Sequence, residues 1–485
     1  MALKNFIVAI ELGSTKITGI AGQQKPDGSI AVLSVVREDA TQCIRKGVVY
    51  NIDKTVQCIT NIMQKLRGQL HVGIKHVFIG VGGQSIHSER NVIIRELQEG
   101  LPVSPQMVAD MMDNNRSMEY PEMEILDVVE QEYRADSLLQ SDPVGVQCSH
   151  LEGNFLNILQ NRRHYNKLNM CFEKAGVKIA EMYLAPFALA DAVLTPIEKR
   201  SGCVLVDMGA ETTTVMVYYK DVLRHIAVIP LGGNNITKDI CSLQIDEMDA
   251  EDMKLRFASA YTPVEEIDSM LKYEIDNDRK VDSTRFIDLV EARVHEIIAN
   301  VWNQVPSDFS DKLLGGLIIT GGGSNMKNIE LAFRKHTNVE KVRIAKFVNM
   351  TVSSTSSEVN AKDGTMNTII GLLAKGDQNC WLQEEQKQPR DIFGTVTPSS
   401  NDTEEYGVTE PRDVNNLPPG VVQTAAEKLA AEKAAVEAEA QRKLEEERRR
   451  KEEEAQRLEE EKRKKPSFGT KIIRFLNSLT KPDEE

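Results

Sequence analysis

The sequence is poor in the features that mark several classes of protein. Aromatic residues make up 5% of its 485 residues, and no apolar run approaches the ~20 residues that a membrane-spanning helix needs. The seven cysteines are scattered without a Cys-x-x-Cys motif, which is typical of reduced cytosolic thiols and not of a disulfide framework. The eight histidines show no metal-ligand spacing. The first residues lead directly into a strand-like run, so no signal peptide is expected.

The 73 acidic residues outnumber the 59 basic ones, and the formal net charge is −14. Residues 424–465 contain thirteen acidic and thirteen basic side chains, and residues 466–485 contain three of each. The whole excess of negative charge therefore lies in the preceding residues. Because nucleic acid is bound by basic surfaces, we expect no nucleic-acid partner. With 41% hydrophobic residues the chain can bury a large core, and its length allows two to four domains.

Three glycine-rich segments stand out, and each follows a β-branched apolar run. They are Ile10–Lys16, Val206–Thr214 and Ile319–Asn325. A second strand-like run follows the first two segments at once, at Ile17–Ile20 and Val215–Tyr218. Strand, tight turn and strand therefore occur twice, about 200 residues apart, which indicates a duplicated domain.

These segments have the chemistry of a phosphate site. Glycine lets backbone N–H groups approach phosphate oxygens, and Ser and Thr hydroxyls add donors. Glu11 and Asp207 occupy matching positions in the two hairpins and could hold a magnesium ion through waters. A plain hairpin with turn glycines explains any one motif, but it is a poor explanation of all three in this order.

The three motifs resemble those of the actin, Hsp70 and sugar-kinase superfamily and, within it, those of the FtsA family of bacterial division proteins. The resemblance covers roughly residues 5–376, and the C-terminal end fits as well. The small-residue apolar segments Tyr183–Ala190 and Thr368–Leu373 fit helices that lie between the two domains of this superfamily. The resemblance implies an α/β, two-lobed actin-like ATPase fold with duplicated ribonuclease-H-like cores and an inserted 1C subdomain of the SHS2 type.

The expected domains follow the order of the chain. They are 1–83 (lobe 1, subdomain 1A, first part), 84–163 (inserted 1C), 164–200 (return to 1A), 201–232 with 307–376 (lobe 2, subdomain 2A), 233–306 (2B), 377–423 (flexible linker), 424–465 (charged single helix) and 466–480 (amphipathic helix). Within the insert, the pattern predicts strands over 91–97 and 124–133, a helix over 105–118 and two short strands over 143–159.

The resemblance implies that ATP and Mg²⁺ bind between the lobes. The two hairpins would meet the phosphates, and the third motif would border the adenosine beside a helix N-terminus. Glu251 and Lys254, on one helix, would reach the ribose. That last pair could equally be a surface i,i+3 ion pair. The expected cofactor-binding residues are Gly13, Ser14, Thr15, Lys16, Asp207, Gly209, Thr212, Thr213, Gly232, Gly233, Glu251, Lys254, Gly321, Gly322, Gly323 and Asn325, with Glu11 and Asp207 at the metal.

The second motif departs from the usual pattern of the superfamily. Ala210 and Glu211 stand where glycines are usual, and Thr214 stands where a second acid is usual. Ala210 restricts the turn, and Glu211 would place negative charge near the phosphates. We therefore expect weak or no ATP hydrolysis, with ATP acting as a conformational ligand. A soluble phosphotransferase of the sugar- or acetate-kinase type and a pilus-assembly ATPase are the alternatives.

The resemblance also implies partners. The C-terminal peptide of the tubulin homologue FtsZ would dock on 2B, where Arg285 and Arg293 are candidate contacts or ordinary surface cations. Self-association into actin-like filaments is expected, and other division proteins are possible partners. The implied role is to tether the FtsZ ring to the membrane and to help assemble the division machinery.

The C-terminal part of the sequence has two distinct patterns. Over 424–465, acid-before-base pairs at i,i+4 favour a solvated single helix over a coiled coil. The segment 466–480 is too short to span a bilayer but suits an amphipathic helix lying on anionic lipid. The protein would then be peripheral, on the cytoplasmic face of the cell membrane at the division site. The expected membrane-contacting residues are Phe468, Lys471, Ile472, Ile473, Arg474, Phe475, Leu476 and Leu479.

Overall fold

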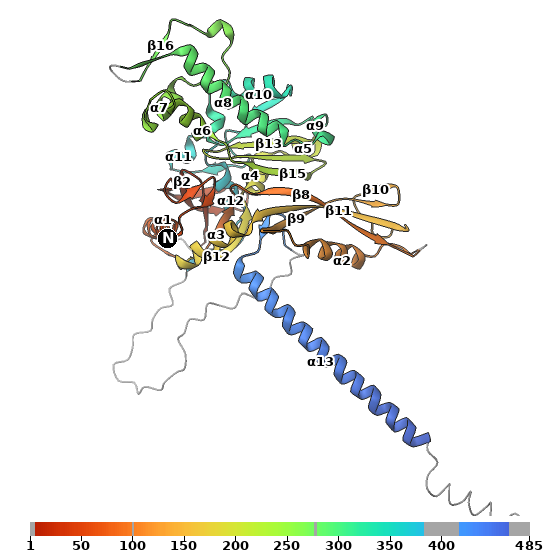
Figure 1. Ribbon diagram of the computed structural model, residues 1–485. Coiled ribbons are helices and arrows are strands. Elements are labelled where there is room, and N and C mark those ends of the chain that lie inside the picture. The colour runs from red at the N-terminus through yellow and green to blue at the C-terminus, as the bar shows by residue number, and fades with distance from the viewer. Residues whose placement is uncertain (1–4, 99–100, 276–278, 383–416, 465–485) are drawn as a thin grey trace, which may run out of the picture. The chain divides into compact units, whose positions relative to one another are not determined.

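The computed structural model describes residues 5–98, 101–275, 279–382 and 417–464. The chain forms two compact units, one of Met1–Thr397 with Val414–Thr424, the other of Pro398–Asp413 with Ala425–Glu485. The first unit contains both large β-sheets (Figure 1), and the second is described only over the helix α13 (Ala425–Lys464).

The first lobe is built on one mixed sheet. In spatial order the core strands are β3 (Ile30–Asp39), β2 (Lys16–Gln24), β1 (Ile7–Leu12), β7 (His76–Val81) and β12 (Lys178–Leu184), with β20 (Val352–Ser353) and β22 (Val421–Val422) at the edges. β2 lies antiparallel to β3 and β1, whereas β1, β7 and β12 are parallel to one another. β1 and β7 are buried along most of their length, as strands covered on both faces are.

The second lobe repeats this core. In spatial order its strands are β15 (Val222–Ile229), β14 (Thr213–Tyr219), β13 (Cys203–Met208), β18 (Gly316–Thr320) and β19 (Val342–Ile344). β14 lies antiparallel to β15 and β13, whereas β13, β18 and β19 are parallel to one another. Order and direction are the same in both lobes, so the predicted duplication of a ribonuclease-H-like core is confirmed.

Four helices cover the first lobe, and two of them pack between the lobes. They are α1 (Ile52–Leu70), α3 (Arg162–Lys174), α4 (Ala185–Val193) and α12 (Asn367–Lys375). α4 and α12 are the two small-residue segments singled out in the sequence, and they contact each other. A Cβ on Gly371 would lie 2.5 Å from the carbonyl oxygen of Ala188, so glycine is what permits this close approach.

The helices of the second lobe surround a separate apolar core. The main ones are α6 (Gly233–Cys241), α7 (Glu247–Phe257), α8 (Ser283–Asn303) and α10 (Ile329–Thr337). The apolar stripe of α8, which includes Phe286, Val290 and Val294, is buried in this core. The smaller elements are α5 (Pro196–Ser201), η1 (Val264–Glu266), β16 (Lys272–Glu274), β17 (Lys280–Asp282), α9 (Ser307–Ser310) and α11 (Ser357–Asn360).

An inserted subdomain connects β7 to α3. Its elements are β8 (His87–Glu96), α2 (Pro105–Arg116), β9 (Met123–Ala135), β10 (Leu138–Gln140) and β11 (His150–Asn161), and they extend sideways from the two cores (Figure 1). The sequence predicts two short strands over 143–159, which is wrong. Pro143 and Gly145 lie in a loop, and one twelve-residue strand, β11, follows. Two register shifts against β9 interrupt its side-chain alternation, which obscures a single long strand in the sequence pattern.

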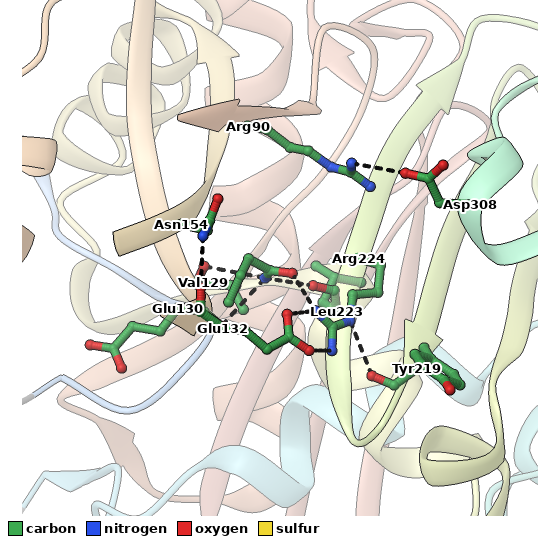
Figure 2. Close-up of polar contacts among 10 residues, drawn as sticks. Arg90, Val129, Glu130, Glu132, Asn154, Tyr219, Leu223, Arg224 and Asp308 are labelled. Carbon is green, nitrogen blue, oxygen red and sulfur yellow. Dashed lines mark hydrogen bonds and ion pairs between the residues drawn. The ribbon is translucent and has the colours of Figure 1, made fainter. Parts of the chain in front are cut away.

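The insert also meets the second lobe (Figure 2). Arg224 on β15 donates to the carboxylate of Glu132 on β9 at 2.6 and 2.7 Å and to the Gln131 amide oxygen at 3.0 Å. Arg90 on β8 lies 3.6 Å from Asp308. One β-bridge between β8 and β15 joins the insert and the second core into a nine-stranded sheet. The insert, which continues covalently from the first lobe, is therefore also bonded to the second.

The stretch 377–423, for which the sequence predicts a flexible linker, contains two packed segments. β21 (Trp381–Leu382) pairs with β6 (Gly73–Ile74), and Cys380 beside it is fully buried. β22 pairs with β12 at the edge of the first sheet. Two-residue strands are too short for a period-2 pattern, so the composition of the surrounding residues determined the prediction.

The charged segment forms a helix in the second unit. α13 covers Ala425–Lys464, and Lys451 lies 2.8 Å from Glu447, one of the i,i+4 pairs expected from the sequence. The amphipathic segment 466–480, with all its expected membrane contacts, lies outside the described residues. Within the described parts of the chain, no helix is both long enough and apolar enough to cross a membrane.

Candidate nucleotide-binding cleft

Two equivalent hairpin turns form the floor of the cleft. The turn after β1 is closed by Gly13 N donating to Lys16 O at 3.0 Å, and the turn after β13 by Gly209 N donating to Thr212 O at 2.8 Å. A Cβ on either glycine would lie 2.9 Å from the accepting carbonyl oxygen. The same local geometry therefore requires glycine at both positions.

The three motifs meet at one cavity of about 800 Å³. It lies in the first unit, with residues of both lobes in its walls. The expected residues that line it are Glu11, Gly13, Ser14, Thr15, Lys16, Asp207, Gly209, Thr212, Gly233, Glu251, Lys254, Gly321, Gly322, Gly323 and Asn325. Segments that are more than 300 positions apart in the sequence thus form one concave site.

Two expected residues do not line the cavity. Thr213 is fully buried and donates its hydroxyl to Leu231 O at 2.9 Å, because side chains alternate along β14 and those of Thr212 and Thr214 take the cavity side. Gly232 lies behind the second turn, and a Cβ there would be 2.6 Å from Gly209 O. Its neighbour Gly233 lines the cavity and donates its N–H to that same oxygen at 3.0 Å.

Glu11 and Asp207 are the acidic pair of the site. Burial, together with the charge of Asp207, raises the pKa of Glu11 to about 7. Burial also raises the pKa of Asp207 to about 6. Both groups would be ionised more readily beside a cation. Among the described residues, no cluster of three or more potential metal ligands occurs, so the pair fits Mg²⁺ that keeps most of its waters.

Lys16 begins β2 at the mouth of the first turn. Burial and the nearby Arg37 guanidinium lower the pKa of Lys16, whereas the carboxylates of Glu11 and Asp363 raise it. An anion bound in the cavity would relieve both destabilising effects, because it would supply opposite charge to a partly desolvated ammonium group.

The third motif provides close backbone approach. Gly321 has φ +82°, and a Cβ there would lie 2.4 Å from Asp207 Oδ1, so only glycine lets the acidic pair and this turn coexist. The helix N-terminus expected beside the motif is that of a four-residue 3₁₀ helix, η2 (Gly322–Asn325), which lies within the motif itself. The α-helix α10 begins only at Ile329. Loop residues separate the motif from the helix, which a glycine pattern does not reveal.

The pair on α7 lies at one wall of the cavity. Lys254 Nζ is 2.6 Å from Glu251 Oε2, and it also donates to the Gly233 carbonyl at 3.2 Å and the Thr237 hydroxyl at 2.9 Å. The Lys254 side chain is 10% exposed, compared with 42% for Glu251. The pair is thus held in place by α6 and is more than an exposed ion pair.

Glu211 does not point into the cavity. Its Oε2 accepts the Lys46 N–H at 2.6 Å, in the hairpin of β4 (Ile44–Arg45) and β5 (Val48–Val49). Glu211 is therefore not among the residues that line the cavity, whereas its neighbour Ala210 and Thr214 are. A partner 165 positions away in the sequence determines the direction of this side chain.

Sequence reasoning missed a fourth glycine segment. Gly80 near the end of β7, and Gly82 and Gly83 directly after it, line the cavity at the place that Gly321–Gly323 occupy after β18. A Cβ on Gly47 would lie 2.5 Å from the Cα of Gly83, and Gly47 N donates to Ser14 Oγ at 2.9 Å. The duplication itself was the available signal, since a third motif in one lobe predicts its counterpart in the other.

The two candidate partner arginines on α8 differ. Arg293 donates to Asp239 Oδ1 at 3.0 Å and pairs with Glu296, and the Asp239 carboxylate raises its pKa. Arg285 borders a shallow hollow of about 670 Å³, whose lining also includes the carboxylates of Asp282 and Asp288. Within the described residues, Arg285 forms no ion pair. Of the two arginines, Arg285 has the more available charge.

Comparisons with known proteins agree with this geometry. A family model described as "Cell division protein FtsA" matches residues 204–364, and one described as "SHS2 domain inserted in FTSA" matches residues 83–159. The chain is also similar, with 15% identity and a TM-score of 0.53, to a solved structure titled "PilM-PilN type IV pilus biogenesis complex", covering 77% of this chain and 98% of that one. At this identity the likeness shows the fold alone.

Curated relatives share most of their length with this chain. The "Cell division protein FtsA" of Porphyromonas gingivalis (strain ATCC BAA-308 / W83) is 30% identical over 388 residues, which is 78% of this chain and 80% of the relative. That of Bacillus subtilis (strain 168) is 26% identical over 430 residues, 87% of this chain and 95% of the relative. The chain therefore belongs to the FtsA family of cell division proteins, with an actin-like fold and an SHS2 insert.

Proposed function

We propose that the cavity binds ATP with Mg²⁺. The convergence of both hairpin turns and the third glycine motif on one cavity carries this proposal. The backbone N–H groups and hydroxyls of Gly13–Lys16 would hold the β- and γ-phosphates from one side, and Gly209 and Thr212 would do so from the other. Glu251 and Lys254 would contact the ribose, and Gly321–Gly323 would border the base.

Magnesium would neutralise phosphate charge next to Glu11 and Asp207. Their raised pKa values support this, because a cation would offset the cost of ionising two buried carboxyls. Each carboxylate would act through a metal-bound water, as Mg²⁺ usually retains several waters when phosphates supply its other ligands.

Turnover is proposed to be weak or absent, with ATP stabilising one arrangement of the lobes. Among the carboxylates that line the cavity, Glu11 and Asp207 are assigned to the metal, and Glu251 is hydrogen-bonded to Thr237 and Lys254. A turnover number above ~1 s⁻¹, which is typical of enzymes, would contradict this proposal and favour a phosphotransferase.

The cellular role that we propose follows from membership of the family. The protein would attach to the cytoplasmic face of the membrane through its terminal amphipathic helix, bind the C-terminal peptide of FtsZ on subdomain 2B, and assemble head to tail. Each helix alone binds lipid reversibly, so assembly would strengthen attachment through multivalency. Electron microscopy on anionic lipid monolayers with ATP tests assembly, and finding only monomers at high protein concentration would contradict it.

Flotation with vesicles tests the membrane role directly. The full chain should float with phosphatidylglycerol-containing vesicles, and the deletion of residues 466–485 should not. Changing Phe475 and Leu476 to Asp should have the same effect, because charge on the apolar face opposes insertion. Val436→Asp, at a 68%-exposed position on α13, is the matched control and should float normally. A truncated protein that still floats would place the anchor elsewhere.

A further inference from the structure

A short segment returns to the first lobe just before α13 begins. Residues 418–424, here called the clasp, contain β22, which pairs antiparallel with β12 through Tyr183↔Val421 and Met182↔Val422. Leu184 N donates to Gly420 O at 2.7 Å. Val421 and Val422 are 4% and 1% exposed. The clasp therefore completes the edge of the first sheet as a seventh strand.

The insert also holds the clasp. Asp127 on β9 is buried, and its Oδ2 accepts the Gly420 N–H at 2.7 Å. Tyr165 on α3 donates its hydroxyl to Gln423 O at 2.6 Å. These contacts satisfy backbone groups that pairing with β12 alone would leave unpaired in a buried place. β12 and α3 of the first lobe and β9 of the insert thus all bond to the clasp.

Gly420 fits its position for two reasons. Its φ is +84°, in the left-handed region that favours glycine, and a Cβ would lie 3.0 Å from the Cβ of Phe187 on α4. The preceding turn is closed by Val421 N donating to Pro418 O at 3.1 Å. Backbone conformation, side-chain packing and buried hydrogen bonds therefore all fix this segment against the first lobe, as would not be expected of an unpacked linker.

We propose that the clasp is an intramolecular anchor that fixes the C-terminal segment to the first lobe at its junction with the insert. Pulling on the C-terminal part of the chain would then load β12 and β9 through the clasp, and not β6 through Leu382, where the preceding packed segment ends. The segment between them would carry no load while the clasp holds. The occupant of this sheet edge is thus the chain's own segment, not a second protein.

Cutting the chain between the body and the clasp tests the anchor. A specific protease site placed within residues 383–416 of the full-length protein would be cleaved, and the products separated by size-exclusion chromatography with light scattering. The C-terminal fragment should remain bound to the body as a one-to-one complex without nucleotide or lipid. A fragment that separates at micromolar concentration would overturn the proposal, as would a two-to-two complex, which indicates exchange between copies.

Matched variants show whether the clasp itself holds the fragment. Val422→Asp should release the fragment after cleavage, because it places a charge at a 1%-exposed position. Tyr165→Phe lies outside the segment, removes only the hydroxyl, and should weaken retention several-fold. Val436→Asp on α13 is the control and should retain the fragment. Retention unchanged in both Val422→Asp and Tyr165→Phe would overturn the proposal. Since no step involves ATP or membrane, this result is independent of the proposed function.

Discussion

Arg224 on β15 and Glu132 on β9 form a two-point ion pair, with the two guanidinium nitrogens 2.6 and 2.7 Å from the two carboxylate oxygens. The Arg224 side chain is 4% exposed, and it also donates to the Tyr219 carbonyl at 3.2 Å. This pair joins the insert to the second lobe (Figure 2). It offers a way to loosen the insert without touching the nucleotide cavity, since neither residue lines that cavity.

Removing the Glu132 carboxylate should weaken this junction. We expect Glu132→Ala to lower the free energy of unfolding by about 1.5–3 kcal/mol, the range for hydrogen bonds to charged groups. The value should fall near the upper limit, because the change leaves the Arg224 guanidinium, whose side chain is 4% exposed, without its carboxylate. Chemical denaturation measures the change. Glu130→Ala on the same strand is the control, since the Glu130 carboxylate points away from Arg224 (Figure 2). Equal effects of both variants would contradict a specific role of the pair.

The acidic pair should make stability and metal binding depend on pH. Glu11 has a folded pKa of about 7 against an ordinary value of 4.5, so the folded state binds more protons. Without ligand, the stability that Glu11 contributes should therefore be fully present below about pH 4.5 and be lost as pH rises through 7. Binding of Mg²⁺ with nucleotide should tighten over the upper part of this range, because the metal needs ionised carboxylates.

Calorimetry at several pH values measures this effect. Glu11→Gln cannot ionise, so it should flatten the dependence of Mg²⁺-nucleotide affinity on pH. Asp53→Asn, an exposed carboxylate in the first turn of α1, is the control and should leave the dependence unchanged. An affinity that is independent of pH between 5 and 8 in the unsubstituted protein would rule out a titrating pair at the metal.

Two adjacent glycines should respond differently to substitution. A Cβ on Gly322 would have its nearest neighbour at 3.7 Å, so Gly322→Ala should fold and bind normally, whereas Gly322→Asp should fold but bind ATP at least tenfold more weakly. A tenfold loss corresponds to about 1.4 kcal/mol. Gly321→Ala should instead lower stability, because φ is +82° and the Cβ would contact Asp207 Oδ1. Thermal denaturation and calorimetry separate these outcomes.

Lys16 should matter for ATP binding through its charge. We expect Lys16→Ala to weaken binding at least tenfold, and Lys25→Ala, an exposed lysine after β2, to have no effect. Wild-type affinity in both Lys16→Ala and Gly322→Asp would contradict the assignment of the cavity to ATP.

The two arginines of α8 should contribute unequally to binding of an acidic peptide. Arg285→Glu should weaken binding of the FtsZ C-terminal peptide at least fivefold, or about 1 kcal/mol, because its charge is available. Arg293→Gln should change peptide affinity less and lower the melting temperature, since Arg293 ties α8 to Asp239 on α6. Fluorescence anisotropy and thermal denaturation measure the two effects. The reverse order of peptide affinities would contradict the assignment.

The glycine motifs could be predicted from the sequence because the tight turns that require glycine are formed by residues close together in the chain. Gly13 and Gly209 close tight turns within four residues, and the β-branched runs before them are buried strands for reasons of composition. The duplication and the strands and helix of the insert followed from such local patterns. The sequence alone thus determined the two cores and most of the cavity lining.

Long-range contacts decided what the sequence left open. Glu211 turns to the Lys46 amide, and Val421 and Val422 pair with a strand some 240 positions earlier. Such partners are set by which backbone groups remain to be satisfied once the lobes have formed, and no local pattern records this. Thr213 and Thr214 differ for the same reason: the pleat of β14 assigns one to the core and one to the cavity only after its neighbours in the sheet are in place.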